Sequence, residues 1–300
     1  MSDTKSAFIA IVGVPNVGKS SLLNALVGRK VAIVSDKPQT TRNRIMGVLT
    51  KDDTQLVFLD TPGSHRPRTR LGDFMIKSIG EAVSGVDVGI LVAEPTTVVR
   101  DAEKELLERF QSQKLPVLLV LNKIDTLANK ASLLMCIDAW RQAYPFESIL
   151  PVSALTGEGI SLLGKELEKF TLPSPHFFPA DTTSDQPDRI LAAELLREQM
   201  LLQLREEIPH GVAVLVERFE ECEGAHGPLL EIDAEIYCER DTHKGIIIGK
   251  RGAMLKSIAS AARQEMESLF GAHVDLQCWV KVKEDWRNRQ GLLNSFGYRE

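Results

Sequence analysis

Short apolar runs alternate with longer amphipathic segments through the first 170 residues of the chain. The runs have the length of buried strands, and the longer segments place their apolar residues at helical spacing. This alternation predicts an α/β domain in which helices cover both faces of a mostly parallel sheet. We expect strands at residues 7–12, 55–59, 88–92, 117–121 and 149–152, and helices at 19–27, 101–111, 131–142 and 160–170.

The alternation stops at residues 171–188, which contain four prolines and several hydroxyl residues but little periodicity. Such a composition is typical of a linker. We expect a first domain over residues 1–172, a linker over 173–188 and a second, α+β domain over 189–300. In the second domain the pattern predicts helices at 189–207, 254–270 and 284–298, and strands at 212–219, 230–239, 242–248 and 274–282.

Composition excludes several classes of protein. The apolar fraction of 43% is ample for packed cores, and a net charge of −5 means that any nucleic-acid partner must meet a local basic patch. The chain has no run of roughly 18 apolar residues that could span a bilayer and no secretory signal pattern. Four scattered cysteines without a CxxC pair argue against a disulfide framework or a zinc site, so we expect a soluble, cytoplasmic protein.

A phosphate-binding pattern lies between the first predicted strand and helix. The segment GVPNVGKS at residues 13–20 matches GxxxxGK[ST], in which backbone N–H groups and a helix N-terminus surround phosphate oxygens. Lys19 supplies a positive charge to the β and γ phosphates, and the Ser20 hydroxyl can coordinate Mg²⁺. The pattern predicts a nucleoside triphosphate site, with these binding residues: Gly13, Asn16, Val17, Gly18, Lys19, Ser20 and Ser21.

The segment NKID at residues 122–125 ends another apolar strand and indicates the base. Asp125 can accept hydrogen bonds from guanine N1–H and from its exocyclic amine, whereas adenine would leave this carboxylate unpaired. Asn122 can tie the loop to the phosphate-binding segment, and the Lys123 stem can cover the ring. A polar loop that merely ends a strand is the alternative, which the neighbouring phosphate pattern disfavours.

Two further strand ends complete the predicted site. Asp60, in the segment DTPG at residues 60–63, can hold Mg²⁺ through water, and the Gly63 N–H can meet the γ-phosphate. Thr61 and Pro62, between Asp60 and Gly63, are also expected to contact the nucleotide. After the strand at 149–152, backbone N–H groups of Ser153 and Ala154 could contact guanine O6.

Along the chain, these four elements occur in the order expected of GTPases of the translation-factor-related class, and the resemblance covers residues 7–170. The resemblance implies that one of Thr40 and Thr41 coordinates Mg²⁺ in the GTP state only, and we favour Thr41. The metal ligands would then be Ser20, Thr41 and Asp60, and the catalytic groups Lys19, Thr41, Asp60 and Gly63. The resemblance also implies switches at residues 31–44 and 61–80 and a role for Asn16 in binding K⁺.

One position departs from many GTPases. They carry a water-orienting glutamine after the glycine of DxxG, whereas this chain has Ser64 followed by His65. We therefore expect slow GTP hydrolysis unless a cation, a partner or another residue assists. His65 as a general base is one alternative, and a solvated switch histidine is the other.

A second motif, GKRG at residues 249–252, lies before the helix predicted at 254–270. Residues 242–264 contain no acidic residue, although residues 189–300 hold 15 Lys and Arg against 19 Asp and Glu. A tight glycine turn with basic middle residues is the KH mode of binding single-stranded RNA. A connection with a solvated charged face is the alternative. The expected RNA contacts are Lys244, Gly249, Lys250, Arg251, Gly252 and Lys256.

Nearly end to end, the chain resembles the Era family of GTPases. The resemblance rests on PNVGKS, QTTR, DTPG, NKID, IIIGKRG and WVKVKEDW, although Ser64 stands where an apolar residue is common. It implies a P-loop GTPase domain with GTP or GDP and Mg²⁺, followed by a C-terminal type II KH domain. It further implies binding to the 3′ end of small-subunit (16S) ribosomal RNA and assistance in assembly of the 30S subunit, gated by GTP. Some members of the family also associate peripherally with the inner membrane. We expect this protein to be a monomer.

Two other functions compete with this interpretation. A GTP-sensing RNA-binding module with negligible turnover would carry the same motifs. A metabolic P-loop kinase would not need the guanine-selective carboxylate of NKID, which therefore argues against that class.

Overall fold

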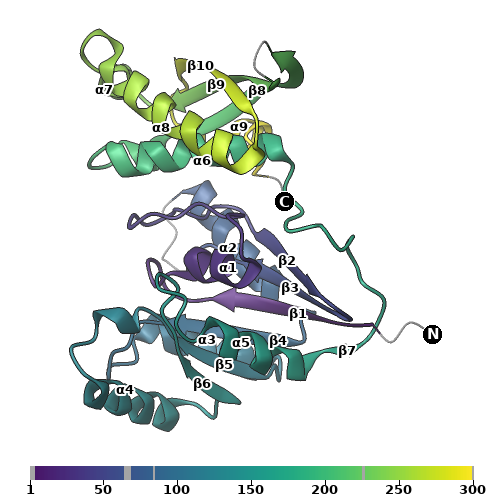
Figure 1. Ribbon diagram of the computed structural model, residues 1–300. Coiled ribbons are helices and arrows are strands. Elements are labelled where there is room, and N and C mark those ends of the chain that lie inside the picture. The colour runs from purple at the N-terminus through teal and green to yellow at the C-terminus, as the bar shows by residue number, and fades with distance from the viewer. Residues whose placement is uncertain (1–3, 64–68, 84, 225–226, 299–300) are drawn as a thin grey trace. The chain divides into compact units, whose positions relative to one another are not determined.

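The computed structural model describes residues 4–63, 69–83, 85–224 and 227–298. The chain divides into two compact units: unit 1 comprises residues 1–67 and 75–185, and unit 2 comprises residues 68–74 and 186–300. Unit 1 has a mostly parallel sheet with helices, and unit 2 has a separate three-stranded sheet, as the sequence pattern predicts (Figure 1).

The sheet of unit 1 has the strand order β2-β3-β1-β4-β5-β6, with β7 paired to β1. The pairs β1–β3, β1–β4, β4–β5 and β5–β6 are parallel, so the residues that follow these strands meet at one edge of the sheet. The pairs β2–β3 and β1–β7 are antiparallel. The strands are β1 Lys5–Val12, β2 Ile45–Lys51, β3 Thr54–Asp60, β4 Val88–Ala93, β5 Val117–Leu121, β6 Ser148–Pro151 and β7 Leu172–Pro173.

Helices cover both faces of this sheet. On one face, Leu22 and Leu26 of α1 and Leu163 of α5 pack with Ile9 and other strand residues. On the other face, side chains of α3 and α4 pack with alternate residues of the same strands, because neighbouring strand residues point to opposite faces. These helices are α1 Lys19–Val27, α3 Asp101–Ser112, α4 Lys130–Ala143 and α5 Ile160–Leu167, with short 3₁₀ turns η1 Ile124–Thr126 and η2 Glu168–Phe170. Helix α2 Arg70–Val83 begins in unit 2 and ends in unit 1.

Strand β2 and helix α2 were not predicted. The pattern of β2 is interrupted by Gly47, which weakens a strand signal. The glycine lets α1 pack closely on β2, since a Cβ there would lie 2.6 Å from Leu23 Cδ1. Helix α2 falls largely within the segment expected to be a switch, residues 61–80, for which no helix was predicted.

The segment predicted as a linker packs on unit 1. We call residues 172–185 the strap. Gln55 of β3, which is fully buried, holds its middle: Oε1 accepts hydrogen bonds from the backbone N–H groups of Phe177 at 2.8 Å and Phe178 at 3.0 Å. Its Nε2 donates to Phe178 O at 2.9 Å, and the Phe177 ring packs edge-on against Phe8. The strap therefore has its own polar anchor inside unit 1.

The end of the strap lies against the outer edge of β2. The Val48 N–H donates to Thr183 O at 2.9 Å, and Ser184 Oγ donates to Met46 O at 2.9 Å. Gly47 and Ser184 form an antiparallel bridge. An edge strand leaves backbone groups unpaired, so the strap supplies partners for part of this edge.

Unit 2 is an α+β domain. Its sheet has the order β10-β9-β8, in which β10 is parallel and β8 antiparallel to β9. None of the helices described in either unit has the length and apolarity needed to cross a membrane. The elements are α6 Asp188–Gln203, η3 Pro209–Gly211, β8 Ala213–Gly224, β9 Gly227–Cys238, α7 Asp241–Ile248, η4 Lys250–Gly252, α8 Ala253–Phe270, β10 His273–Val282, η5 Trp286–Asn288 and α9 Gln290–Ser295.

The strand predicted at residues 242–248 is wrong, because this segment forms helix α7. Three consecutive isoleucines favour a strand by propensity, but only Ile247 is buried while Ile246 remains half exposed. Such one-sided burial fits a short amphipathic helix, and tertiary packing overrides propensity here. The helix predicted at 284–298 is shorter than expected: η5 and α9 are separated by Arg289, which has an extended conformation.

We predict that Gln55→Leu releases the middle of the strap. The variant leaves the N–H groups of Phe177 and Phe178 without their acceptor, which should lower the free energy of unfolding by about 2–4 kcal/mol. Urea denaturation measures this loss, and hydrogen exchange should accelerate at those two amides. As a control, His176→Ala removes a single contact of a half-buried side chain, which lies 3.1 Å from Asp53 O, and should change stability by less than about 0.5 kcal/mol. Unchanged exchange in Gln55→Leu would contradict the anchoring role.

Candidate functional site

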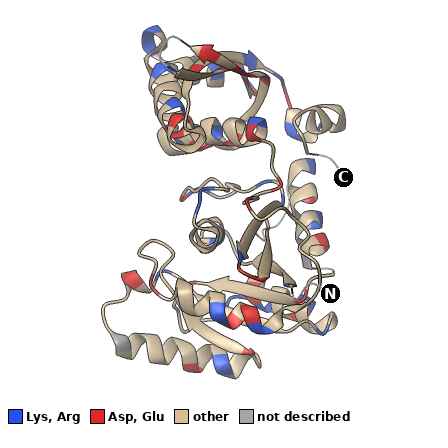
Figure 2. Ribbon diagram, turned by 45° about the vertical axis from the view of Figure 1, so that its right-hand side comes forward, with Lys and Arg blue, Asp and Glu red and all other residues tan. Residues whose placement is uncertain are grey.

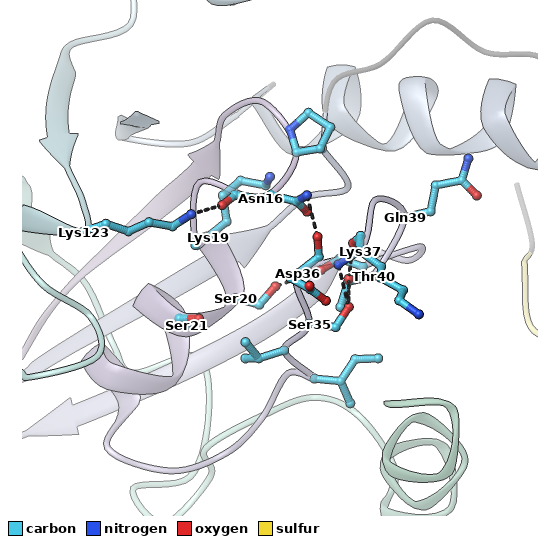
Figure 3. Close-up of a pocket in the computed structure, with 16 residues that line it drawn as sticks. Asn16, Lys19, Ser20, Ser21, Ser35, Asp36, Lys37, Gln39, Thr40 and Lys123 are labelled. Carbon is cyan, nitrogen blue, oxygen red and sulfur yellow. Dashed lines mark hydrogen bonds between the residues drawn. The ribbon is translucent and has the colours of Figure 1, made fainter. Parts of the chain in front are cut away.

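A cavity of about 420 Å³ lies at the carboxyl edge of the unit 1 sheet. Two segments face each other across it: the loop after β1 and the segment before β2 (Figure 3). Lys123 reaches it from the loop after β5. The lining residues are Pro15, Asn16, Gly18, Lys19, Ser20, Ser21, Ile33, Val34, Ser35, Asp36, Lys37, Gln39, Thr40, Thr41, Gly63 and Lys123.

The loop after β1 has the geometry of a phosphate cradle. Gly18 has φ 92°, and a Cβ there would lie 2.3 Å from Asn122 Nδ2, so both conformation and space require glycine. A Cβ on Gly13 would lie 2.4 Å from Val92 O. Buried Lys19 folds back over the loop, and its Nζ donates to Gly13 O at 3.2 Å and Val14 O at 3.1 Å. Phosphate oxygens would replace these carbonyl contacts.

Three oxygen-bearing side chains meet beside Lys19. Ser20 Oγ donates to Asp60 Oδ2 at 2.7 Å and lies 2.8 Å from Thr41 Oγ1. All three side chains are buried, and Asp60 Oδ1 has no hydrogen-bond partner among the described residues. A buried carboxylate oxygen without a partner is costly unless a cation approaches it. These hard oxygen donors fit Mg²⁺, which Ser20, Thr41 and Asp60 would hold.

The nucleotide would complete this metal site. Among the residues that the structure describes, no group of three His, Cys, Asp or Glu side chains could hold a metal ion on its own. Mg²⁺ is commonly bound by one or two protein oxygens together with substrate phosphates. When bound, the ion would neutralise charge on the β and γ phosphates.

Burial shifts both charged groups of the cradle. It lowers the pKa of Lys19 to about 8, against the opposing attraction of Asp60. It raises the pKa of Asp60 to about 6, although the Lys19 charge and hydrogen bonds act in the opposite direction. Each group therefore carries its charge at a desolvation cost that a bound metal–nucleotide complex would offset.

The loops after β5 and β6 are joined by side chains. Asn122 is buried; its Nδ2 donates to Val17 O at 2.8 Å, and its Oδ1 accepts from the Ala154 N–H at 3.0 Å. Ser153 Oγ donates to Asp125 Oδ1 at 2.6 Å. Asp125 is exposed, and the bond from Ser153 engages Oδ1 and not Oδ2. A carboxylate that recognises a base must be accessible in this way. The loops that would contact guanine thus adjoin the phosphate cradle.

The segment before β2 is folded onto the cradle. Asn16 Nδ2 donates to Asp36 O at 2.7 Å (Figure 3). Thr40 Oγ1 donates to Lys37 O at 2.6 Å and lies 2.7 Å from Ser35 Oγ, so it turns away from the metal cluster that Thr41 joins. This placement favours Thr41 over Thr40 as the metal ligand. The role of Asn16 in binding K⁺ stays a prediction.

The remaining predicted residues of the first motifs also lie at this edge. Thr61 is buried and its Oγ1 donates to Ile11 O at 3.0 Å, which fixes the turn after β3. Pro62 follows it, and a Cβ on Gly63 would lie 2.9 Å from Pro15 Cα, so the turn closely approaches the phosphate loop. Ser64 and His65, considered for water orientation and general base catalysis, lie outside the described residues.

In unit 2 the GKRG turn joins helices α7 and α8. Gly249 has φ 71°, and a Cβ there would lie 2.7 Å from Met254 Cβ. Lys250 and Arg251 are exposed at the apex, and Arg251 itself has φ 52°. Lys256 is exposed on the first turns of α8, Lys244 is half-buried on α7, and Gly252 precedes α8 as its N-cap in a left-handed conformation. Acidic residues are common on the strands of this unit, as Figure 2 shows in red.

Several residues of the cavity were not predicted to line it. Ser35, Asp36 and Lys37 fall within the segment expected to be a switch, residues 31–44, but they were not named as site residues, and they line the cavity because the chain folds back over the phosphate loop. Glu94, which contacts Lys123, was also missed. Its position directly after an apolar strand, like those of Asp60 and Asn122, was the available signal.

We predict that Mg²⁺ affinity falls as the pH drops through about 6, because protonated Asp60 cannot serve as a ligand. Above that pH the free protein holds the carboxylate ready, and below it each pH unit should cost about tenfold in affinity. Mg²⁺ titration of the nucleotide-bound protein between pH 5 and 7.5 measures the profile. Asp60→Asn should bind Mg²⁺ weakly and retain only the titration of the nucleotide phosphates. Parallel profiles for the two proteins would contradict the assignment.

We predict that Asp125→Asn shifts base preference from guanine to xanthine. The amide can donate to the xanthine 2-oxo group, but it keeps only one of the two acceptor oxygens that guanine requires and turns an N–H donor toward the guanine 2-amine, which should cost about a hundredfold or more in GTP affinity. Competition between GTP and XTP measures the shift. Glu158→Gln removes an exposed carboxylate of the loop after β6 and serves as the matched control. Unchanged GTP affinity in Asp125→Asn would refute the role in base recognition.

Comparison with known proteins agrees with this geometry. Residues 8–123 match the family described as 50S ribosome-binding GTPase, and residues 207–287 match the KH domain family. The chain is 47% identical to GTPase Era of Clostridioides difficile, with 99% of both chains covered, and 46% identical to GTPase Era of Ruminiclostridium cellulolyticum, with 98% covered.

Two solved structures extend the likeness to three dimensions. One is an Aquifex aeolicus Era variant bound to GDP·AlF4⁻, and the other is Era in complex with MgGDPNP and nucleotides 1506–1542 of 16S ribosomal RNA. Each matches 99% of this chain and 100% of its own at a TM-score of 0.93 and 39% identity. The predicted family is therefore confirmed, and the chain belongs to the Era family of GTPases, with a P-loop GTPase domain followed by a KH domain.

Proposed function

We propose that this GTPase binds the 3′ end of small-subunit ribosomal RNA through its KH domain and assists assembly of the 30S subunit, with bound nucleotide controlling the RNA contact. It binds GTP or GDP with Mg²⁺ in the cavity of unit 1 and hydrolyses GTP slowly. The proposal rests on one observation: the same chain contains the Ser20–Thr41–Asp60 cluster and the exposed basic GKRG turn.

The GKRG turn is suited to a nucleic-acid backbone. Its two glycines allow close approach, and Lys250 and Arg251 project from it with no acidic residue between positions 242 and 264. The RNA in the matching Era complex belongs to the small subunit, which supports this partner over the large subunit of the broader family's name.

The chain path supports coupling between nucleotide and RNA. Thr41 joins the metal cluster, and β2 begins four residues later at Ile45. The strap ends on β2 at Thr183 and Ser184, and α6 of the second unit begins at Asp188. A change at Thr41 when the γ-phosphate leaves would therefore act on the strand that holds the connection to the KH domain.

Turnover separates this proposal from a GTP sensor. GTP hydrolysis should be measurable in the isolated protein and should change on addition of a 3′-terminal 16S RNA fragment. Hydrolysis at the rate of free GTP, with and without RNA, would instead favour a sensor.

We predict that Lys250→Glu combined with Arg251→Glu weakens binding of that RNA fragment on the order of tenfold to a hundredfold at low salt, because two phosphate contacts become repulsive. GTP affinity should stay unchanged. Filter binding or fluorescence anisotropy measures the RNA affinity.

The control is Arg141→Glu combined with Lys165→Glu, which makes the same change in net charge on exposed helix positions of unit 1. A 23S RNA fragment tests the choice of subunit. Full RNA affinity in the Lys250/Arg251 variant, or preference for the 23S fragment, would overturn the assigned partner.

A further inference from the structure

Glu94 occupies a central position at the edge of the unit 1 sheet, outside the recognised motifs. It directly follows β4, which lies between β1 and β5 in the sheet. The phosphate loop follows β1 and the base loop follows β5, so Glu94 stands between the two halves of the nucleotide site. Its Oε1 accepts a hydrogen bond from Lys123 Nζ at 2.7 Å.

The Lys123 ammonium bridges both loops. Besides Glu94, Nζ donates to Asn16 O at 2.6 Å (Figure 3). Lys123 and Asn16 have φ values of 67° and 66°, a left-handed conformation that is uncommon for residues other than glycine. Such conformations persist only where the surroundings determine them. The ammonium thus joins two unusual backbone positions, one in each loop.

Glu94 is itself held in place by its loop. Trp140 Nε1 donates to Thr96 O at 3.1 Å, and the Arg100 N–H donates to Glu103 Oε2 at 2.7 Å at the start of α3. Arg100 also lies 3.4 Å from the second oxygen of Glu94. The carboxylate is therefore presented to Lys123 from a fixed support.

The contact contributes little to folding. Side-chain exposure is 38% for Lys123 and 33% for Glu94, and ion pairs with this exposure stabilise a fold by less than about 1 kcal/mol. A lysine side chain, in contrast, has many rotamers, and fixing it before a ligand arrives removes an entropy cost from binding. The effect of the pair is expected on nucleotide binding.

We propose that Glu94 is a positioning residue for the guanine nucleotide: it holds the Lys123 ammonium against the Asn16 carbonyl, so that the aliphatic stem of Lys123 stays extended where the base binds. The inference rests on the guanine-nucleotide site described above. Hydrogen bonding to Lys123 lowers the pKa of Glu94, which keeps the carboxylate charged at neutral pH.

A double-mutant cycle tests the proposal, with GDP dissociation measured by stopped-flow fluorescence. Glu94→Gln keeps the shape but removes the charge, and Lys123→Met keeps the stem but removes the ammonium. We expect each single variant to release GDP about tenfold faster, and Glu94→Gln to add less than about twofold in the Lys123→Met background, because both changes remove one interaction. Glu94→Asp should recover part of the loss.

Lys104→Gln is the matched control, since it removes an exposed positive charge of α3 that pairs with Asp101 and not with Glu94, and it should change GDP release by less than about twofold. The thermal unfolding temperature should be unchanged in all variants. A Glu94→Gln effect of equal size in both backgrounds would show a structural role independent of Lys123. Normal GDP release in Glu94→Gln alone would overturn the proposal and leave the guanine site standing. Normal release in Lys123→Met would overturn the base contact of Lys123 and the proposal with it.

Discussion

The buried side-chain amide of Asn122 is the interaction on which the nucleotide site depends. One end binds Val17 O in the phosphate loop, and the other accepts the Ala154 N–H in the loop after β6. These hydrogen bonds connect three segments that follow different strands. The parallel sheet brings these strand ends to one edge. The hydrogen bonds of the Asn122 amide then fix the positions of the three loops relative to one another. Gly18 is required beside it, because no side chain fits against the amide nitrogen.

Buried charge at the nucleotide site is the second constraint. The pKa of Asp60 is raised and that of Lys19 is lowered, both chiefly by burial. An acid with a raised folded-state pKa costs stability once the pH exceeds its unfolded value, fully so above about 6. A base with a lowered folded-state pKa costs stability once the pH falls below its unfolded value, fully so below about 8, so both costs are present at neutral pH. Binding of a metal and a polyphosphate offsets both, which links stability to occupancy.

The parts of the site that could be predicted from sequence are local. Residues 13–20, 60–63 and 122–125 are contiguous, and each follows an apolar strand whose end must reach the sheet edge. The cavity wall at residues 35–37, the Glu94 contact and the strap depend on pairings between distant segments, which no local pattern encodes. The same holds for α7, where packing around Ile247 overrides the strand propensity of three isoleucines. Propensity is reliable only where tertiary contacts agree with it.

We propose that the bound nucleotide controls the affinity for RNA, and one binding measurement tests this directly. The affinity of the full chain for a single-stranded 3′-terminal 16S fragment should be compared in the presence of Mg²⁺ with GDP or with a non-hydrolysable GTP analogue. Binding should be at least about tenfold tighter with the analogue, since that difference corresponds to an ordinary coupling free energy of about 1.4 kcal/mol. Equal affinities would contradict it, because the GTPase site and the KH domain would then act independently.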